Sequence, residues 1–100
     1  MPRVWRSWSS KAIAAIEDHD RHTRGIVVLG LDAPEDALAA SFAVAAAFPL
    51  VRGFAVGRTI FGAVARDWFA GGMDDAAAVA AMAERYARLC AIWDRARAAA

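Results

Sequence analysis

The residues best suited to chemistry are Gly57, Arg58 and Thr59, which directly follow an apolar run from Leu50 to Val56. An amphipathic helix is predicted to begin here. Unpaired backbone N–H groups and the helix dipole attract anions to such an end, and glycine allows an anion close to the backbone. The pattern therefore favours a phosphate group beside Arg58.

A packing explanation for the glycines stays open. Gly53 and Gly57 could be small only because the strand lies close against helices. Arg58 has no comparable packing reason to end a buried strand. Nucleotide-binding motifs are excluded, because the stretch from Gly53 to Thr59 is one residue short of a phosphate loop and has arginine where that motif needs lysine. No Gly-x-Gly-x-x-Gly sequence follows either predicted strand.

Two strands are expected to position these residues. Residues 26–31 and 50–56 are continuous apolar runs, which is typical of strands buried on both faces of a parallel sheet. Asp32, Pro34 and Glu35 favour a helix start between them, so that strand, helix and strand form a βαβ unit. Asp32 is also a candidate substrate-facing carboxylate, although helix capping explains it equally well.

Two further helices are predicted towards the C-terminus. Thr59 is expected to cap the first, which ends at the glycine pair 71–72, and Asp74 or Asp75 to cap the second. The last helix is long and carries apolar residues on one side, with Glu84 and Arg88 paired four residues apart on its outer face.

The N-terminal quarter is less regular. Ser9 or Ser10 could cap a helix that runs to about Asp18, and residues 18–25 form a polar segment that includes His19 and His22. Two histidines and two aspartates suggest a metal site, but no third cluster of ligands completes it, so we favour a solvated connection. No metal and no cofactor are expected.

Composition narrows the class of protein. The chain has 100 residues, a net charge of +1 and a single cysteine, Cys90, which excludes an internal disulfide. Its arginines are spread along the sequence, which argues against a nucleic-acid interface. No apolar stretch reaches the length of a membrane span and no secretion signal is present, so we expect a cytoplasmic protein.

Two parallel strands are too few for a stable sheet, because both edges leave backbone groups unpaired. A third strand from residues 1–10, strands from another chain, or a larger parent domain would solve this problem. The alternation of strands and helices favours the last, and predicts a partial (β/α)8 barrel: one partial domain over residues 1–100, with the last two βα units and a long C-terminal helix in residues 25–100.

Residues 25–34, the stretch from Gly53 to Phe61 and the ending around Met82, Tyr86 and Trp93 resemble one family. This is the aldolase-like domain fused to the sugar kinase 5-dehydro-2-deoxygluconokinase in bacterial myo-inositol catabolism, itself similar to class I tagatose-bisphosphate aldolases. The resemblance covers residues 24–97 well and residues 1–23 loosely. It implies a (β/α)8 barrel of which this chain holds the C-terminal part.

The resemblance implies that Gly30, Gly57 and Arg58 bind phosphate. It carries over no catalytic residue: the family's Schiff-base lysine ends a tryptophan-rich strand, and the nearest match is Trp5-Arg6. Arginine stays protonated and cannot form a Schiff base. The only lysine, Lys11, lies at the predicted start of a helix.

These observations predict a domain that binds a phosphorylated sugar or phosphate and is not catalytic alone. The alternative is a non-catalytic interaction module. It would pair with a second copy, or with a chain that supplies the missing strands.

Overall fold

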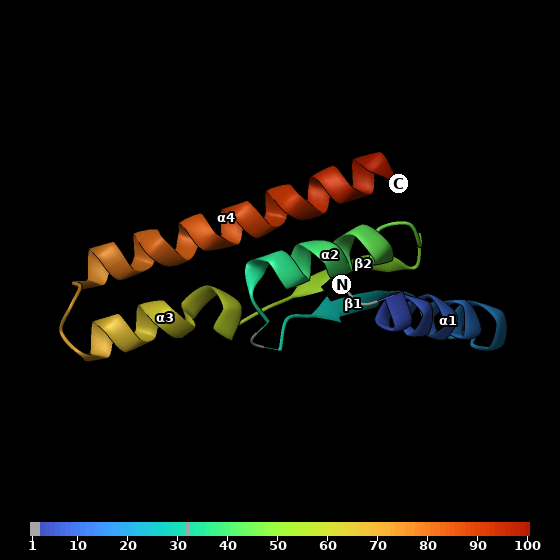
Figure 1. Ribbon diagram of the computed structural model, residues 1–100, viewed down its shortest axis with the longest axis horizontal. Helices are drawn as coiled ribbons and strands as arrows, with labels where there is room; N and C mark the ends of the chain where they lie inside the picture. Colours follow the sequence, from blue (N-terminus) through green and yellow to red (C-terminus); the bar gives the residue numbers. More distant parts are fainter. Residues whose placement is uncertain (1–2, 32) are drawn as a thin grey trace.

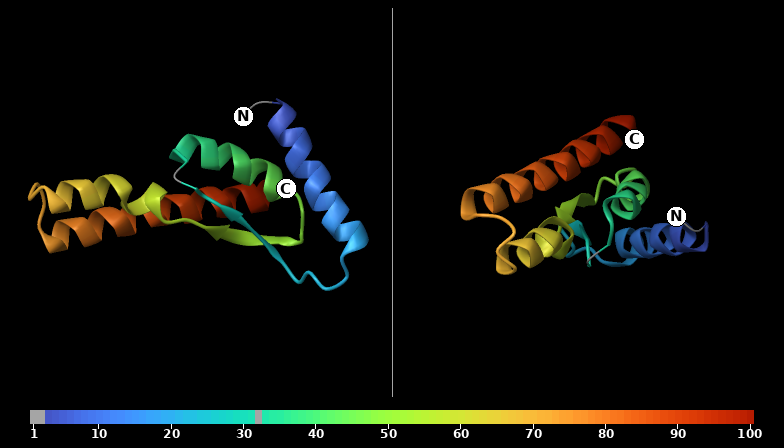
Figure 2. Two further views of the ribbon diagram at one scale, coloured as in Figure 1. Left: turned by 90° about the horizontal axis from the view of Figure 1, so that it is seen from below. Right: turned by 60° about the vertical axis from the view of Figure 1, so that its left-hand side comes forward.

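The computed structural model describes residues 3–31 and 33–100, with side chains from Lys11 onwards. In this part of the chain there are four helices and two strands, in the order α1 (Arg3–His19), β1 (Ile26–Leu29), α2 (Glu35–Ala45), β2 (Val51–Ala55), α3 (Arg58–Phe69) and α4 (Asp75–Ala99). The molecule is elongated, with extents of 50 × 25 × 25 Å. Helix α4 runs along both α2 and α3, and α1 packs on α2 (Figures 1 and 2).

The two strands are parallel and α2 connects them, so the predicted βαβ unit is confirmed. The register pairs Val27 with Gly53 and Leu29 with Ala55, after an irregularity between Ile26 and Val27. Both strands end at the same edge. At this edge β1 leads into the loop before α2, and β2 leads into α3.

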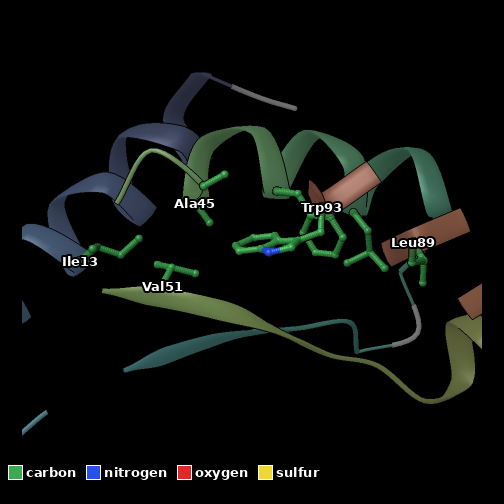
Figure 3. Packing of buried hydrophobic residues seen from close by; sticks show 8 residues of the cluster. Ile13, Ala45, Val51, Leu89 and Trp93 are labelled. Carbon is green, nitrogen blue, oxygen red and sulfur yellow. The ribbon is translucent and has the colours of Figure 1, made fainter. Parts of the chain in front are cut away.

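The hydrophobic core lies between β2, α2 and α4 (Figure 3). Phe42 of α2 is fully buried and packs against Phe54, with ring centroids 4.8 Å apart, and against Trp93 at 5.4 Å in an edge-to-face arrangement. Such aromatic pairs stabilise by about 0.5 to 1.5 kcal/mol beyond the area that they bury. The remaining buried members of the cluster are Ile13, Leu38, Ala45, Ala46, Val51 and Leu89.

The prediction of strands buried on both faces is wrong. Val27 and Leu29 are 53% and 56% exposed, whereas Val28 between them packs against the core. Among the described residues, α2 and α4 contribute to one core on the face of the sheet that carries Val28, and the side chains of Val27 and Leu29 are exposed.

The partial barrel prediction is therefore wrong as well. A barrel strand is covered by side chains inside the barrel and by helices outside it. Here the described residues form a mostly helical protein around a two-stranded sheet, and the second face of that sheet is open.

The N-terminal segment adds no third strand over residues 3–19. This stretch is a single helix, α1, which begins at Arg3 instead of near Ser9. Ile13 of α1 is buried in the core, so the helix contributes packing to the domain.

Helix α1 ends in a polar turn organised by Asp20. Its carboxylate accepts hydrogen bonds from the Thr23 hydroxyl at 2.6 Å and from the His22 backbone N–H at 2.9 Å. These bonds lower the pKa of Asp20 below its usual value, with the Thr23 hydroxyl as the largest cause. The segment is thus a hydrogen-bonded connection at the surface.

The predicted cap of the last helix is confirmed, because the Asp74 carboxylate accepts from the Ala77 N–H at 2.8 Å. The pairing of Glu84 with Arg88 is also confirmed, at 2.7 Å. Across residues 3–31 and 33–100, none of the helices combines the length and apolar character needed to cross a membrane.

Candidate anion-binding site at the strand ends

A cavity of about 470 Å³ opens where the two parallel strands end. Its lining includes Gly30, which follows β1, and Gly57 and Arg58, which follow β2. The three residues named by sequence as phosphate-binding thus meet at one edge of the sheet. Leu29, Leu31, Ala55, Val56 and Phe61 complete the lining.

Gly30 contributes space and no hydrogen-bond donor. Its N–H donates to the Ala55 carbonyl at 3.0 Å, so this group is already paired within the protein. A Cβ on Gly30 would lie 2.7 Å from Cγ1 of Val56 and 3.4 Å from Oγ1 of Thr59. Close packing therefore explains this glycine directly.

A tight turn follows Gly30, closed by a 2.9 Å hydrogen bond from the Ala33 N–H to the Gly30 carbonyl. Leu31 in this turn has a φ of 49°, in the left-handed region that branched residues seldom adopt. It is also largely exposed at the rim of the cavity. Asp32, the candidate substrate-facing residue, lies outside the described residues.

Gly57 forms the N-terminal boundary of α3, and no side chain caps this helix. The N–H groups of Arg58 and Thr59 therefore have no intrahelical acceptor and no capping partner, which is the arrangement that binds anions. The next N–H, that of Ile60, already donates to the Gly57 carbonyl at 2.9 Å. A Cβ on Gly57 would lie 3.2 Å from the ring of Phe61, whereas Gly53 has nothing within 4 Å. The packing explanation consequently applies weakly to Gly57 and does not apply to Gly53.

The prediction that Thr59 caps α3 is wrong. Thr59 lies inside the helix, and its hydroxyl instead donates to the Ala33 carbonyl at 2.7 Å. This bond fixes the first turn of α3 against the loop that leads into α2.

Arg58 is the first residue of α3 and its side chain is exposed. It lines the cavity at the strand ends and also a second, polar cavity of about 260 Å³ on the other side, between α2, α3 and α4. A guanidinium in this position combines its own charge with the positive end of the helix dipole.

Sequence reasoning missed Arg66 and Arg85, which line the second cavity together with Arg58 and Arg88. Arg58 and Arg66 are eight residues apart, about two helical turns, so they occupy one face of α3. This spacing was a usable signal for Arg66. Arg85 lies on α4 and reaches the cavity through the packing of α3 on α4, which no local pattern reveals.

Lys11 and the Trp5-Arg6 pair all lie in α1. The resemblance to aldolase-like domains would place a strand at Trp5-Arg6. Helix α1 joins the sheet at the opposite end from the cavity, because it leads into the start of β1. In the described part of the chain, the strand-end cavity has a cationic arginine in its lining and no lysine.

The described residues define a small, mostly helical protein with a two-stranded parallel sheet, whose βαβ unit ends in an arginine-bearing cavity. The sequence model of one protein family matches residues 2–97, and the chain belongs to that family, which is described as "Uncharacterized protein conserved in bacteria (DUF2090)". No curated protein and no solved structure matches the chain.

Proposed function

We propose that the chain binds the phosphate group of a phosphorylated sugar at the start of α3, with Arg58 as its cationic partner. One observation carries this proposal: an exposed arginine stands at the uncapped N-terminus of α3, beside the cavity where both strands end. Arginine binds phosphate oxygens in pairs, and the free N–H groups of the helix start add further donors.

The sequence resemblance supports the sugar phosphate as the ligand class. The stretch from Gly53 to Phe61 resembles the phosphate-binding end of the aldolase-like domain associated with 5-dehydro-2-deoxygluconokinase in inositol catabolism. The only lysine, Lys11, lies in α1, so we propose binding without Schiff-base catalysis by this chain alone.

Calorimetric titration with a ketose phosphate, and with the same sugar lacking phosphate, tests the proposal. Arg58→Ala should weaken binding of the phosphorylated sugar at least tenfold, as expected for the loss of a charge-assisted hydrogen bond. Arg52→Ala removes an exposed arginine from β2, outside the cavity lining, and should change affinity less than twofold. Equal affinity of the Arg58→Ala variant and the unmodified chain would refute the proposal.

The open sheet face favours a second candidate function, an interaction module that pairs with another chain. Val27 and Leu29 expose apolar side chains on this face, and the strand edges offer unpaired backbone groups. Sedimentation velocity distinguishes the two candidates. A monomer at high micromolar concentration would count against self-pairing, whereas a dimer weakened by Leu29→Lys would support it.

A further inference from the structure

The second cavity that Arg58 lines has four arginines among its ten lining residues. Its walls come from the start of α2, from α3 and from α4, and they enclose about 260 Å³. Four arginines and one glutamate, Glu35, line it. The lining therefore carries three net positive charges.

Only one of these arginines is engaged by carboxylates among the described residues. Arg88 pairs with Glu35 at 3.3 Å and with Glu84 at 2.7 Å. The hydrogen bond to Glu35 is the largest cause that raises the pKa of Arg88. The two carboxylates orient this guanidinium. Within residues 3–31 and 33–100, no ion pair forms at Arg58, Arg66 or Arg85.

Two helix N-termini face the same cavity. Helix α2 begins at Glu35 after Pro34, and α3 begins at Arg58 after Gly57. No side chain caps α3, whereas in the first turn of α2 the Asp36 carboxylate accepts from the Ala37 N–H at 2.9 Å. Pro34 and Arg58 both belong to the cavity lining. The positive end of the α3 dipole thus adds to the charge of the arginines, whereas Glu35 and Asp36 offset that of α2.

Arg58 and Arg66, the arginines of α3, line the same side of the second cavity, with Gly62 between them. A Cβ at Gly62 would be 3.9 Å from Nη1 of Arg66 and 4.0 Å from Cβ of Arg58. The guanidinium of Arg66 therefore folds back over Gly62 towards Arg58. Arg85 faces this row from α4, so cations surround the cavity from two helices.

We infer that this cavity binds a small anion with two adjacent phosphate groups, of the diphosphate class, through Arg58, Arg66 and Arg85. Two phosphate groups carry roughly three to four negative charges near neutral pH, which matches the net charge of the lining. One guanidinium group can bind two oxygens of a phosphate group at once. The arginines of α3 and Arg85 of α4 can therefore each bind one of the two phosphate groups.

This site shares Arg58 with the sugar-phosphate site proposed at the strand ends, and the two sites differ in the other residues that line them. Arg66 and Arg85 line only the diphosphate cavity, whereas Gly30 and Gly57 line only the other. Variants of Arg66 and Arg85 therefore test this inference alone.

Titration calorimetry with inorganic pyrophosphate and inorganic phosphate, at low ionic strength, provides the test. Pyrophosphate should bind at least tenfold more tightly than phosphate. Arg66→Ala and Arg85→Ala should each weaken pyrophosphate binding about tenfold, because each removes a charge-assisted contact. Arg95→Ala, an exposed arginine of α4 outside the cavity, is the matched control and should change the affinity less than twofold.

Arg85 is half-buried, so Arg85→Lys serves as a second variant that keeps the charge and loses the fork. It should bind pyrophosphate more tightly than Arg85→Ala and less tightly than the unmodified chain. Equal effects of the Arg95→Ala control and the cavity variants, or no pyrophosphate binding at all, would overturn the inference. Loss of sugar-phosphate binding in Arg58→Ala together with unchanged pyrophosphate binding in Arg66→Ala and Arg85→Ala would leave the sugar-phosphate site and remove the diphosphate site.

Discussion

The Thr59 hydroxyl donates a 2.7 Å hydrogen bond to the carbonyl oxygen of Ala33, 26 residues earlier in the chain. This contact joins the first turn of α3 to the loop between β1 and α2. Both cavities border this junction, since Arg58 lines each of them. The partly buried Thr59 hydroxyl therefore helps to fix the position of Arg58 relative to the loop before α2.

Replacing that hydroxyl should loosen the junction. Thr59→Val preserves the shape of the side chain but leaves the Ala33 carbonyl without its donor, so it should lower the free energy of unfolding by about 1 kcal/mol. Chemical denaturation monitored by circular dichroism measures the loss. Thr59→Ser keeps the hydroxyl and should lose less than half as much; equal losses in the two variants would contradict a role for the hydrogen bond.

The glycines near the site should respond to alanine in opposite ways. Gly30→Ala forces a Cβ to 2.7 Å from Cγ1 of Val56, whose branched side chain has little rotamer freedom, and should destabilise by about 1 to 3 kcal/mol. Gly53→Ala meets no atom within 4 Å and should be neutral or stabilising. Thermal unfolding compares the two variants.

A second substitution tests whether the contact with Val56 is the reason that Gly30 is required. Adding Val56→Ala to Gly30→Ala removes the clashing methyl groups, so the double variant should be more stable than the sum of the single effects predicts. Additive losses would show that Gly30 is required for another reason.

Sequence patterns located most elements of the fold because their signals are local. The Asp74 cap, the acidic first turn of α2 and the two apolar strand segments all depend on residues within a few positions of one another. Which face of the sheet the helices cover depends on residues that are far apart in the sequence. Val27 and Val28 are chemically identical, yet only Val28 meets the core, because α2 and α4 pack on one face alone.

The same contrast between local signals and long-range packing applies to the residues of the candidate site. Gly57 and Arg58 were predicted because they are adjacent to a strand end and a helix start. Arg66 and Arg85 were missed because their proximity depends on how α3 packs against α4. The cap predicted at Thr59 failed because a long-range carbonyl, that of Ala33, takes the hydroxyl.

The turn after α1 should show an unusually acidic carboxyl group. Hydrogen bonds from Thr23 and His22 favour the charged form of Asp20 and lower its pKa in the folded protein. This contribution to stability is therefore complete above the usual carboxyl pKa and is lost as the pH falls through the lowered value. NMR titration should find the Asp20 pKa depressed, and Thr23→Ala, which removes the largest cause, should return it most of the way; an unchanged pKa in that variant would contradict the assignment.

Arg97, half-buried near the C-terminal end of α4, should contribute more to stability than the exposed Arg95. Its guanidinium donates to the carbonyls of Ala46 at 2.9 Å and Phe48 at 3.2 Å, and also to that of Val51. These groups lie at the end of α2 and the start of β2, where helix carbonyls lack intrahelical partners. The guanidinium also stacks 4.9 Å from the centre of the Trp93 ring.

Arg97→Ala should consequently lower the free energy of unfolding by about 3 kcal/mol, since it removes three partly buried, charge-assisted hydrogen bonds to backbone carbonyls. Arg97→Lys keeps the charge but not the planar fork, and should recover less than half of this loss. Urea denaturation of both variants, with exposed Arg95→Ala as a control expected to stay within about 0.5 kcal/mol, measures these differences. If Arg97→Ala were no more destabilising than Arg95→Ala, the hydrogen bonds from Arg97 to the end of α2 and the start of β2 would make no net contribution to stability.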